Sequence, residues 1–174
     1  MRLARMIAQR LTALVPPVLV EAHCDIPCGI YDPHTAQISA LTIVRMNQLI
    51  AELPKPGPHT TPEERDAYVH KLSRYTAVKE EHAEVCKREL RVLWGDYFTP
   101  DHLKQYPDVH TLFWDAMKLA SKVRQEINLQ TSQDLLAKVQ AIAELFWKSK
   151  GADTRRQPSL QKSGGELLYP VPKK

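Results

Sequence analysis

Apolar residues recur every three or four positions through most of the chain, the spacing that places them on one face of an α-helix. The first such stretch follows Asp32-Pro33, an N-cap with proline at the first helical position, and continues to Leu53. The sequence PKPGPHTTP then interrupts the spacing with four prolines and one glycine. We therefore predict one helix from about residue 33 to residue 53, followed by a loop.

Three more amphipathic stretches follow this loop. Each begins beside a residue suited to the first turn of a helix and ends where the apolar spacing breaks. The predicted helices run from Pro62 to Trp94, from Val109 to Ile127, and from a cap at Thr131 or Ser132 to Gly151. No stretch alternates apolar and polar residues for long enough to predict a strand.

Four amphipathic helices with short connections predict an all-α fold, an antiparallel up-and-down four-helix bundle. The segment 151–174 has no apolar periodicity and is rich in Gly, Ser and Pro, so we predict a flexible C-terminal tail. The bundle domain would then span residues 23–150, with residues 1–22 as a separate leader.

The positive charge of the chain lies at its two ends. The formal net charge is +4, but residues 1–22 hold three arginines against one glutamate, and residues 151–174 hold five basic against two acidic side chains. The bundle itself is close to neutral, so we expect no nucleic-acid-binding surface on it. No stretch has the apolar length of a membrane span, and we expect no stable association with a membrane.

The leader has the order of features of a secretory signal: basic MRLARMIAQR, apolar LTALVPPVLV, then small residues at Val20 and Ala22 before His23. The apolar run has only ten residues and contains two prolines. We predict removal of residues 1–22 by a protease at the Ala22–His23 bond, with a disordered N-terminal tail as the alternative. A cytoplasmic location is expected, with export as the alternative because the leader resembles a weak signal peptide.

The sequence HCDIPCGIYDP, residues 23–33, holds two of the three cysteines beside a histidine. After cleavage, the amine of His23 and the amide nitrogen and thiolate of Cys24 would close two fused five-membered chelate rings on one metal. Cys28 could add a second thiolate, and the His23 imidazole could reach an axial position. Two nitrogens and two sulfurs in a plane suit nickel(II) or copper(II), and the thiolates favour redox work. An incidental thiol pair or part of a zinc site is the alternative on spacing alone.

This N-terminal metal-binding hook, together with LWGDYF at residues 93–98, QYPDVH at 105–110 and FWKSK at 146–150, resembles the nickel-containing superoxide dismutases. The resemblance implies a homohexamer of four-helix bundles, with a nickel ion as cofactor and superoxide as substrate. It also implies disproportionation to dioxygen and hydrogen peroxide by nickel(II)/nickel(III) cycling, after leader removal.

The resemblance assigns roles to single residues. It implies nickel ligands at His23, Cys24 and Cys28. It further implies that Tyr31, with Tyr97 behind it, positions the superoxide anion and ordered water at the open face of the metal.

The resemblance also implies that Asp25 organises the hook and that Asp96 belongs to the surrounding pocket. Actinobacterial members carry glutamate at the position of Ser39 and arginine at the position of His82, both near the axial imidazole. A non-catalytic metal-binding helical bundle, which has lost turnover through these two differences, is the alternative function. Cys86 lies four residues after His82, a spacing that could seat a metal on one helix face, but a buried thiol is the preferred reading.

Overall fold

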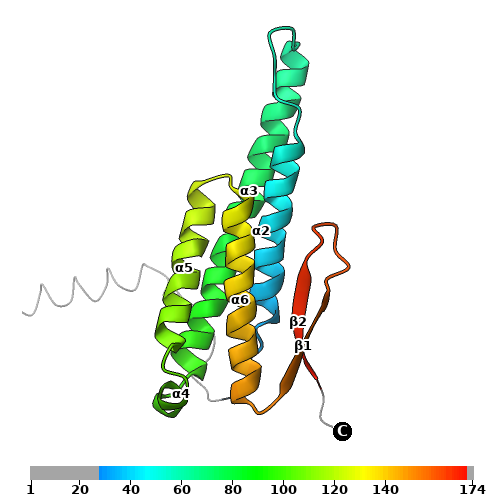
Figure 1. Cartoon of the computed structure of the whole chain (residues 1–174). Helices are drawn as coiled ribbons and strands as arrows, with labels where there is room; N and C mark the ends of the chain where they lie inside the picture. The colour runs from blue at the N-terminus through cyan, green and yellow to red at the C-terminus, as the bar shows by residue number, and fades with distance from the viewer. Residues whose placement is uncertain (1–27, 172–174) are drawn as a thin grey trace, which may run out of the picture.

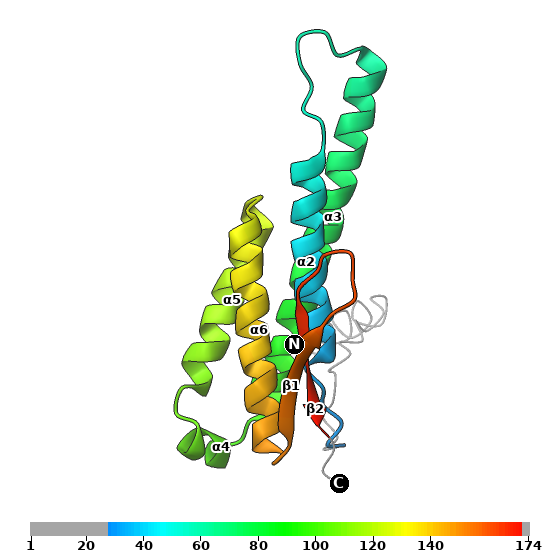
Figure 2. The same ribbon diagram turned by 45° about the vertical axis from the view of Figure 1, so that its right-hand side comes forward.

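The computed structural model describes residues 28–171, and the bundle occupies most of this range (Figure 1). Its helices are α2 (His34–Glu52), α3 (Pro62–Val92), α5 (Val109–Gln125) and α6 (Leu129–Ser149). Both views show α2 and α3 running alongside each other and projecting beyond α5 and α6 at one end (Figures 1 and 2). The predicted four-helix bundle is confirmed.

Two short elements join α3 to α5. The π-helical turn η1 (Leu93–Tyr97) ends the long helix, and α4 (Pro100–Gln105) follows it. The turn is closed by a bond from the Phe98 amide to the Leu93 carbonyl at 3.2 Å, one residue wider than an α-helical bond. The predicted connector is therefore largely helical, and the second helix ends two residues before the predicted Trp94.

Local capping explains where α3 begins. The Thr61 hydroxyl accepts from the Glu64 amide at 3.2 Å, while the Glu64 carboxylate accepts from the Thr61 amide at 2.9 Å. This reciprocal pair satisfies two of the amides that a helix start leaves unbonded. The predicted start at Thr61-Pro62 is confirmed.

The predicted cap of α6 is wrong. Asn128 caps this helix, because its side-chain oxygen accepts from the Thr131 amide at 3.1 Å. The Thr131 hydroxyl instead donates to Glu126 at 2.6 Å, and the Ser132 hydroxyl donates to the Leu129 carbonyl at 2.7 Å. Both candidate caps are buried inside the first turn, and an earlier amide side chain takes their place.

The core lies between the four helices. Its largest fully buried apolar side chains come from all four of them: Ile43, Leu90, Phe113, Leu135, Ile142 and Phe146. Lys79 is also only 1% exposed, and its ammonium donates to the Val123 and Glu126 carbonyls at 2.7 and 2.6 Å. Burial lowers the pKa of Lys79, opposed by the charges of Glu80 and Glu126. The Lys79 side chain of α3 therefore bonds two carbonyls at the C-terminal end of α5 that a helix end leaves without partners.

The predicted flexible tail is wrong. Residues 153–171 form an antiparallel hairpin of β1 (Asp153–Pro158) and β2 (Glu166–Val171), paired from Asp153 opposite Val171 to Pro158 opposite Glu166. Leu167 and Leu168 are each 2% exposed. Adjacent strand residues point to opposite faces, so burial of both hides the period-two pattern by which strands are found in a sequence.

No helix within residues 28–171 is long and apolar enough to cross a membrane.

Candidate metal centre and its surroundings

The predicted hook reaches the described structure at Cys28. His23, Cys24 and Asp25 lie outside the described residues, and nothing is assigned to them from the structure. The Cys28 side chain is exposed, and Gly29 follows with a φ of 70°, a left-handed conformation that glycine adopts without steric cost. The chain then reaches Tyr31 and enters α2.

Tyr31 and Tyr97 are brought together from distant parts of the chain. Their ring centroids lie 5.5 Å apart with an interplanar angle of 59°. Tyr31 precedes α2, whereas Tyr97 is the last residue of η1. A π-turn shifts the residues that follow it around the helix axis, and such turns are frequent at functional sites. The turn therefore gives the LWGDYF motif a structural role, which is to set the direction of Tyr97.

The Tyr97 ring is held by further aromatic side chains. Phe146 lies at 4.6 Å, Phe98 at 5.0 Å with perpendicular planes, and His102 stacks at 5.3 Å, all measured between centroids. Edge-to-face and stacked rings restrict the ring orientation more than aliphatic neighbours do. Tyr97 is therefore a half-buried side chain with a fixed ring orientation, and Tyr31 is one of its ring neighbours.

The Tyr97 hydroxyl has a defined partner at the end of α6. It lies 2.6 Å from the Ser149 hydroxyl, and Ser149 donates to the Phe146 carbonyl at 2.7 Å. A carbonyl can only accept, so the Ser149 proton points to Phe146, and Tyr97 donates to Ser149. The remaining lone pairs of Tyr97 can accept from another group. Sequence reasoning missed Ser149, although it stands within the quoted FWKSK motif.

A positive charge lies beside the same tyrosine. The Lys150 ammonium is 5.4 Å from the Tyr97 ring centroid and 4.9 Å from that of Phe146, within the range of cation–π contacts. Lys150 is exposed, so its charge acts on anions that approach from solvent. Sequence reasoning also missed this residue, because its proximity to Tyr97 depends on how α6 packs.

The other predicted pocket residues are more scattered. Asp96 is exposed in η1, Ser39 is 3% exposed on α2, and His82 is half-buried on α3. The His82 Nδ1 lies 2.9 Å from the Val78 carbonyl, so this nitrogen carries the proton. Within residues 28–171 no hydrogen bond joins Ser39 to His82, so the described structure does not bring this pair together through such a bond.

Cys86 is a buried core residue, as the sequence predicted. Its side chain is fully buried, and burial, with a smaller effect of the Glu89 charge, raises its pKa to about 12. Without a metal, this group stays a thiol at neutral pH. Residues 28–171 contain no group of three His, Cys, Asp or Glu side chains that could hold a metal ion. Of the two described cysteines, the soft, solvent-accessible donor that suits nickel is Cys28.

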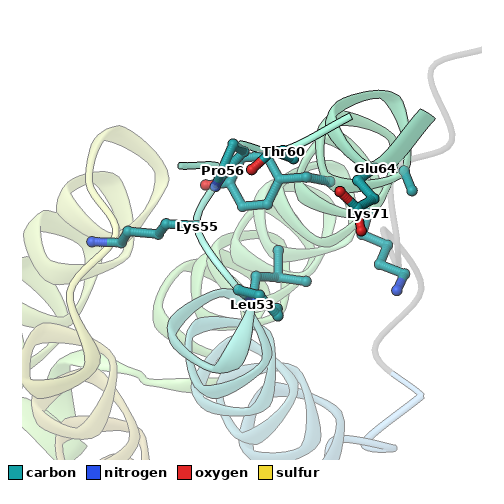
Figure 3. Close-up of a pocket in the computed structure, with 9 residues that line it drawn as sticks. Leu53, Lys55, Pro56, Thr60, Glu64 and Lys71 are labelled. Atoms are coloured by element: carbon teal, nitrogen blue, oxygen red, sulfur yellow. The ribbon is translucent and has the colours of Figure 1, made fainter. Parts of the chain in front are cut away.

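The pocket drawn in Figure 3 lies at the far end of α2 from Tyr31. It encloses about 320 Å³ around the loop between α2 and α3 and is lined by residues that include Leu53, Thr60, Glu64 and Lys71. At 1.5 Å per residue, the 19 residues of α2 separate it from the tyrosine pair by roughly 28 Å. This pocket is not part of the site.

Known proteins resemble this chain over most of its length. The family model described as nickel-containing superoxide dismutase matches residues 18–150. Proteins named superoxide dismutase [Ni] from Streptomyces seoulensis and Streptomyces coelicolor are each 36% identical over 137 residues, covering 79% of this chain and 95% of the relative.

Solved structures are similar over the same extent. A native nickel superoxide dismutase structure at 1.30 Å is 34% identical, with a TM-score of 0.63, and covers 74% of this chain and 99% of its own. A crystal structure with nickel ligation corresponding to the oxidised state is 35% identical, with a TM-score of 0.64, and covers 75% and 100%. The chain belongs to the family of nickel-containing superoxide dismutases.

Proposed function

We propose that this chain is a superoxide dismutase whose nickel ion is held by the N-terminal hook, through His23, Cys24 and Cys28. The observation that carries the proposal is the contact between Tyr31 and Tyr97, whose ring centroids lie 5.5 Å apart. Tyr31 follows the proposed ligand Cys28 by three residues. Family membership supports the same conclusion, since the match begins before the hook and ends at residue 150. The alternative, a helical bundle without turnover, is not favoured.

The donor set fits the proposed metal. Two thiolates and two backbone nitrogens are soft, anionic ligands of the kind that nickel(II) accepts in a planar arrangement. The bound ion supplies a one-electron couple, by which two superoxide anions and two protons become one dioxygen and one hydrogen peroxide. Each superoxide is an anion, and each turnover takes up two protons. The surrounding side chains must therefore attract and orient an anion and position water that can supply protons.

Those tasks can be divided among the residues beside the hook. The exposed Lys150 attracts the incoming anion by its charge. Tyr31 follows Cys28 by three residues and contacts the Tyr97 ring, and we assign it the task of orienting the anion or a water molecule. Tyr97 supports Tyr31 from behind, and because it donates to Ser149 it can serve Tyr31 or a water only as an acceptor.

The proposal includes maturation and assembly. The α-amine of His23 can be a ligand only after cleavage at Ala22–His23, because in the uncut chain this nitrogen is an amide without a basic lone pair. A protease that removes the leader is therefore required. We further propose the homohexamer that the resemblance implies, and light scattering of the cleaved protein measures it.

Three forms of the protein test the function. The full-length chain, the chain cleaved before His23, and the cleaved chain with one added alanine before His23 are each given nickel and assayed for superoxide removal. We expect activity in the cleaved form alone, since one extra residue converts the amine into an amide. Equal activity in all three forms would exclude the amine as a ligand. Nickel binding without turnover in the cleaved form would favour the non-catalytic alternative.

A further inference from the structure

The C-terminal hairpin connects α6, which ends at Ser149 beside Tyr97, with α2, which begins three residues after Tyr31. It leaves α6 directly after Ser149, through a turn in which the Gly151 amide donates to the Lys148 carbonyl at 2.9 Å and the Ala152 amide donates to the Trp147 carbonyl at 3.0 Å. Gly151 has a φ of 71°, the left-handed conformation that ends many helices. The hairpin then lies along α2 and α6, as both views show (Figures 1 and 2).

Gln37 joins the hairpin to the first turns of α2. Its side-chain nitrogen donates to the Leu168 carbonyl at 3.0 Å, and its side-chain oxygen accepts from the Leu168 amide at 2.8 Å. Both residues are 2% exposed or less. The Gln37 amide side chain thus makes the two hydrogen bonds that a neighbouring strand would make to Leu168. Because both residues are buried, the groups left unbonded by a break could not bond to water instead.

The same glutamine is one bond away from the base of the hook. Its backbone amide donates to the Pro33 carbonyl at 3.1 Å, the first bond of α2. Beside it, the His34 ring lies 5.7 Å from the Tyr169 ring of β2. The hairpin therefore contacts α2 at His34 and Gln37, within the first four residues after the segment from Cys28 to Pro33.

Two other glutamines tie the hairpin elsewhere. Gln48 donates to the Ser163 carbonyl at 3.0 Å, eleven residues further along α2 and at the tip of the hairpin. Gln140 donates to the Glu166 carbonyl at 2.7 Å from α6. The chain thus offers one tie beside the hook and another on the same helix that is roughly 16 Å away along its axis.

We propose that the hairpin of residues 153–171 is a staple that holds the start of α2 against the end of α6, and so fixes the base from which the nickel hook departs. The staple rests on the proposed function in one respect, since the group it positions is the hook. The family match ends at residue 150, so the staple is an addition of this chain to the family bundle. Its residues are positioning residues and do not touch the reacting atoms.

The test compares Gln37→Met with Gln48→Met in the nickel-loaded protein that is cleaved before His23 and keeps its hairpin. Methionine keeps the length of the side chain and removes both polar atoms. We expect Gln37→Met to release nickel to a chelator about tenfold faster, the equivalent of one or two buried hydrogen bonds. Gln48→Met should release nickel at the wild-type rate, although it lowers the melting temperature.

Equal release rates in wild type and Gln37→Met, or the same acceleration in both variants, would overturn the staple. Wild-type protein that binds nickel and removes superoxide keeps the proposed function intact in either case. A second measurement needs no variant. In the native protein, hydrogen exchange of the Leu168 amide and of the Gln37 amide, the first that is bonded in α2, should proceed with the same opening free energy. Independent exchange of the two segments would also overturn the staple.

Discussion

Cys28 and Cys86 carry the same side chain in two regions that treat it in opposite ways. Cys28 stands at the end of the hook, exposed beside a tyrosine pair. Cys86 faces the core from the C-terminal part of α3, and burial raises its pKa to about 12. The spacing of each to a histidine had suggested a metal site. Access to water separates them, because a thiol becomes a ligand only where its anion is tolerated.

The same contrast applies to the histidines that accompany the two cysteines. His82 uses Nδ1 within its own helix, at 2.9 Å from the Val78 carbonyl, and so cannot offer that nitrogen to a metal at Cys86. Two residues four positions apart lie on the same face of a helix, and whether that face is buried or exposed decides whether they can bind a metal. In this bundle the face of Cys86 is the core.

The largest expected effect comes from making the same change in both regions. Cys28→Ala should abolish nickel binding in the planar site and reduce superoxide removal to background, because it deletes one of four donors. Cys86→Ala should keep full nickel content and activity and cost about 1 kcal/mol of stability through lost packing. Metal content and activity of the two purified variants check this. Loss of nickel from Cys86→Ala would remove the distinction between the two cysteines.

A second, intermediate effect is expected in the pH dependence of stability. The pKa of Cys86 is about 12 in the folded protein against 9.0 for the free group, so the unfolded chain loses this proton first. Above pH 9.0 the wild type should therefore lose stability faster than Cys86→Ala, by up to about 1.4 kcal/mol per pH unit.

Urea unfolding of the metal-free proteins from pH 7 to pH 10.5 measures this difference. The gap in unfolding free energy between wild type and variant should be constant below pH 8.5, shrink above it and change sign before pH 10.5. A constant gap over the whole series would show that Cys86 ionises as readily in the folded protein as in the unfolded chain.

The smallest expected effect concerns the Tyr97 hydroxyl and its hydrogen bond to Ser149. Tyr97→Phe removes the bond to Ser149 and should cost about 1 kcal/mol of stability. Tyr75→Phe, on α3, is the matched control, since the described residues offer its hydroxyl no hydrogen-bond partner. A double-mutant cycle with Ser149→Ala should give a coupling energy of similar size. Additive losses in that cycle would contradict the bond on which the orientation of Tyr97 rests.

Much of the bundle could be predicted because its signals are local. The start of α3 depends on Thr61 and Glu64, three residues apart, and the apolar spacing of α5 and α6 marks the buried face of each helix. Local reasoning failed where two local solutions competed. Asn128 and Thr131 can both cap a helix, and the burial of Thr131 beside Glu126 decided in favour of Asn128.

The hook belongs to what the sequence by itself determined. The order of amine, amide and thiolate in His23-Cys24, and the reach of Cys28, follow from covalent bonds and need no tertiary contact to form a chelate. The predicted cleavage before His23 rests on the same covalent reasoning and stays a prediction. These features could be named before the fold was known because covalent geometry limits them to a few residues.

Only the tertiary structure decided which side chains meet near the described end of the hook sequence, residues 28–33. Tyr31 meets Tyr97 across 66 positions of chain, Ser149 holds that tyrosine from the end of α6, and Gln37 bonds a strand residue 131 positions away. The hairpin followed the same logic, since β2 is stabilised by burial against α2 and α6 and not by a pattern of its own. Contacts of this kind depend on how helices pack, and neither periodicity nor capping within a few residues carries that information.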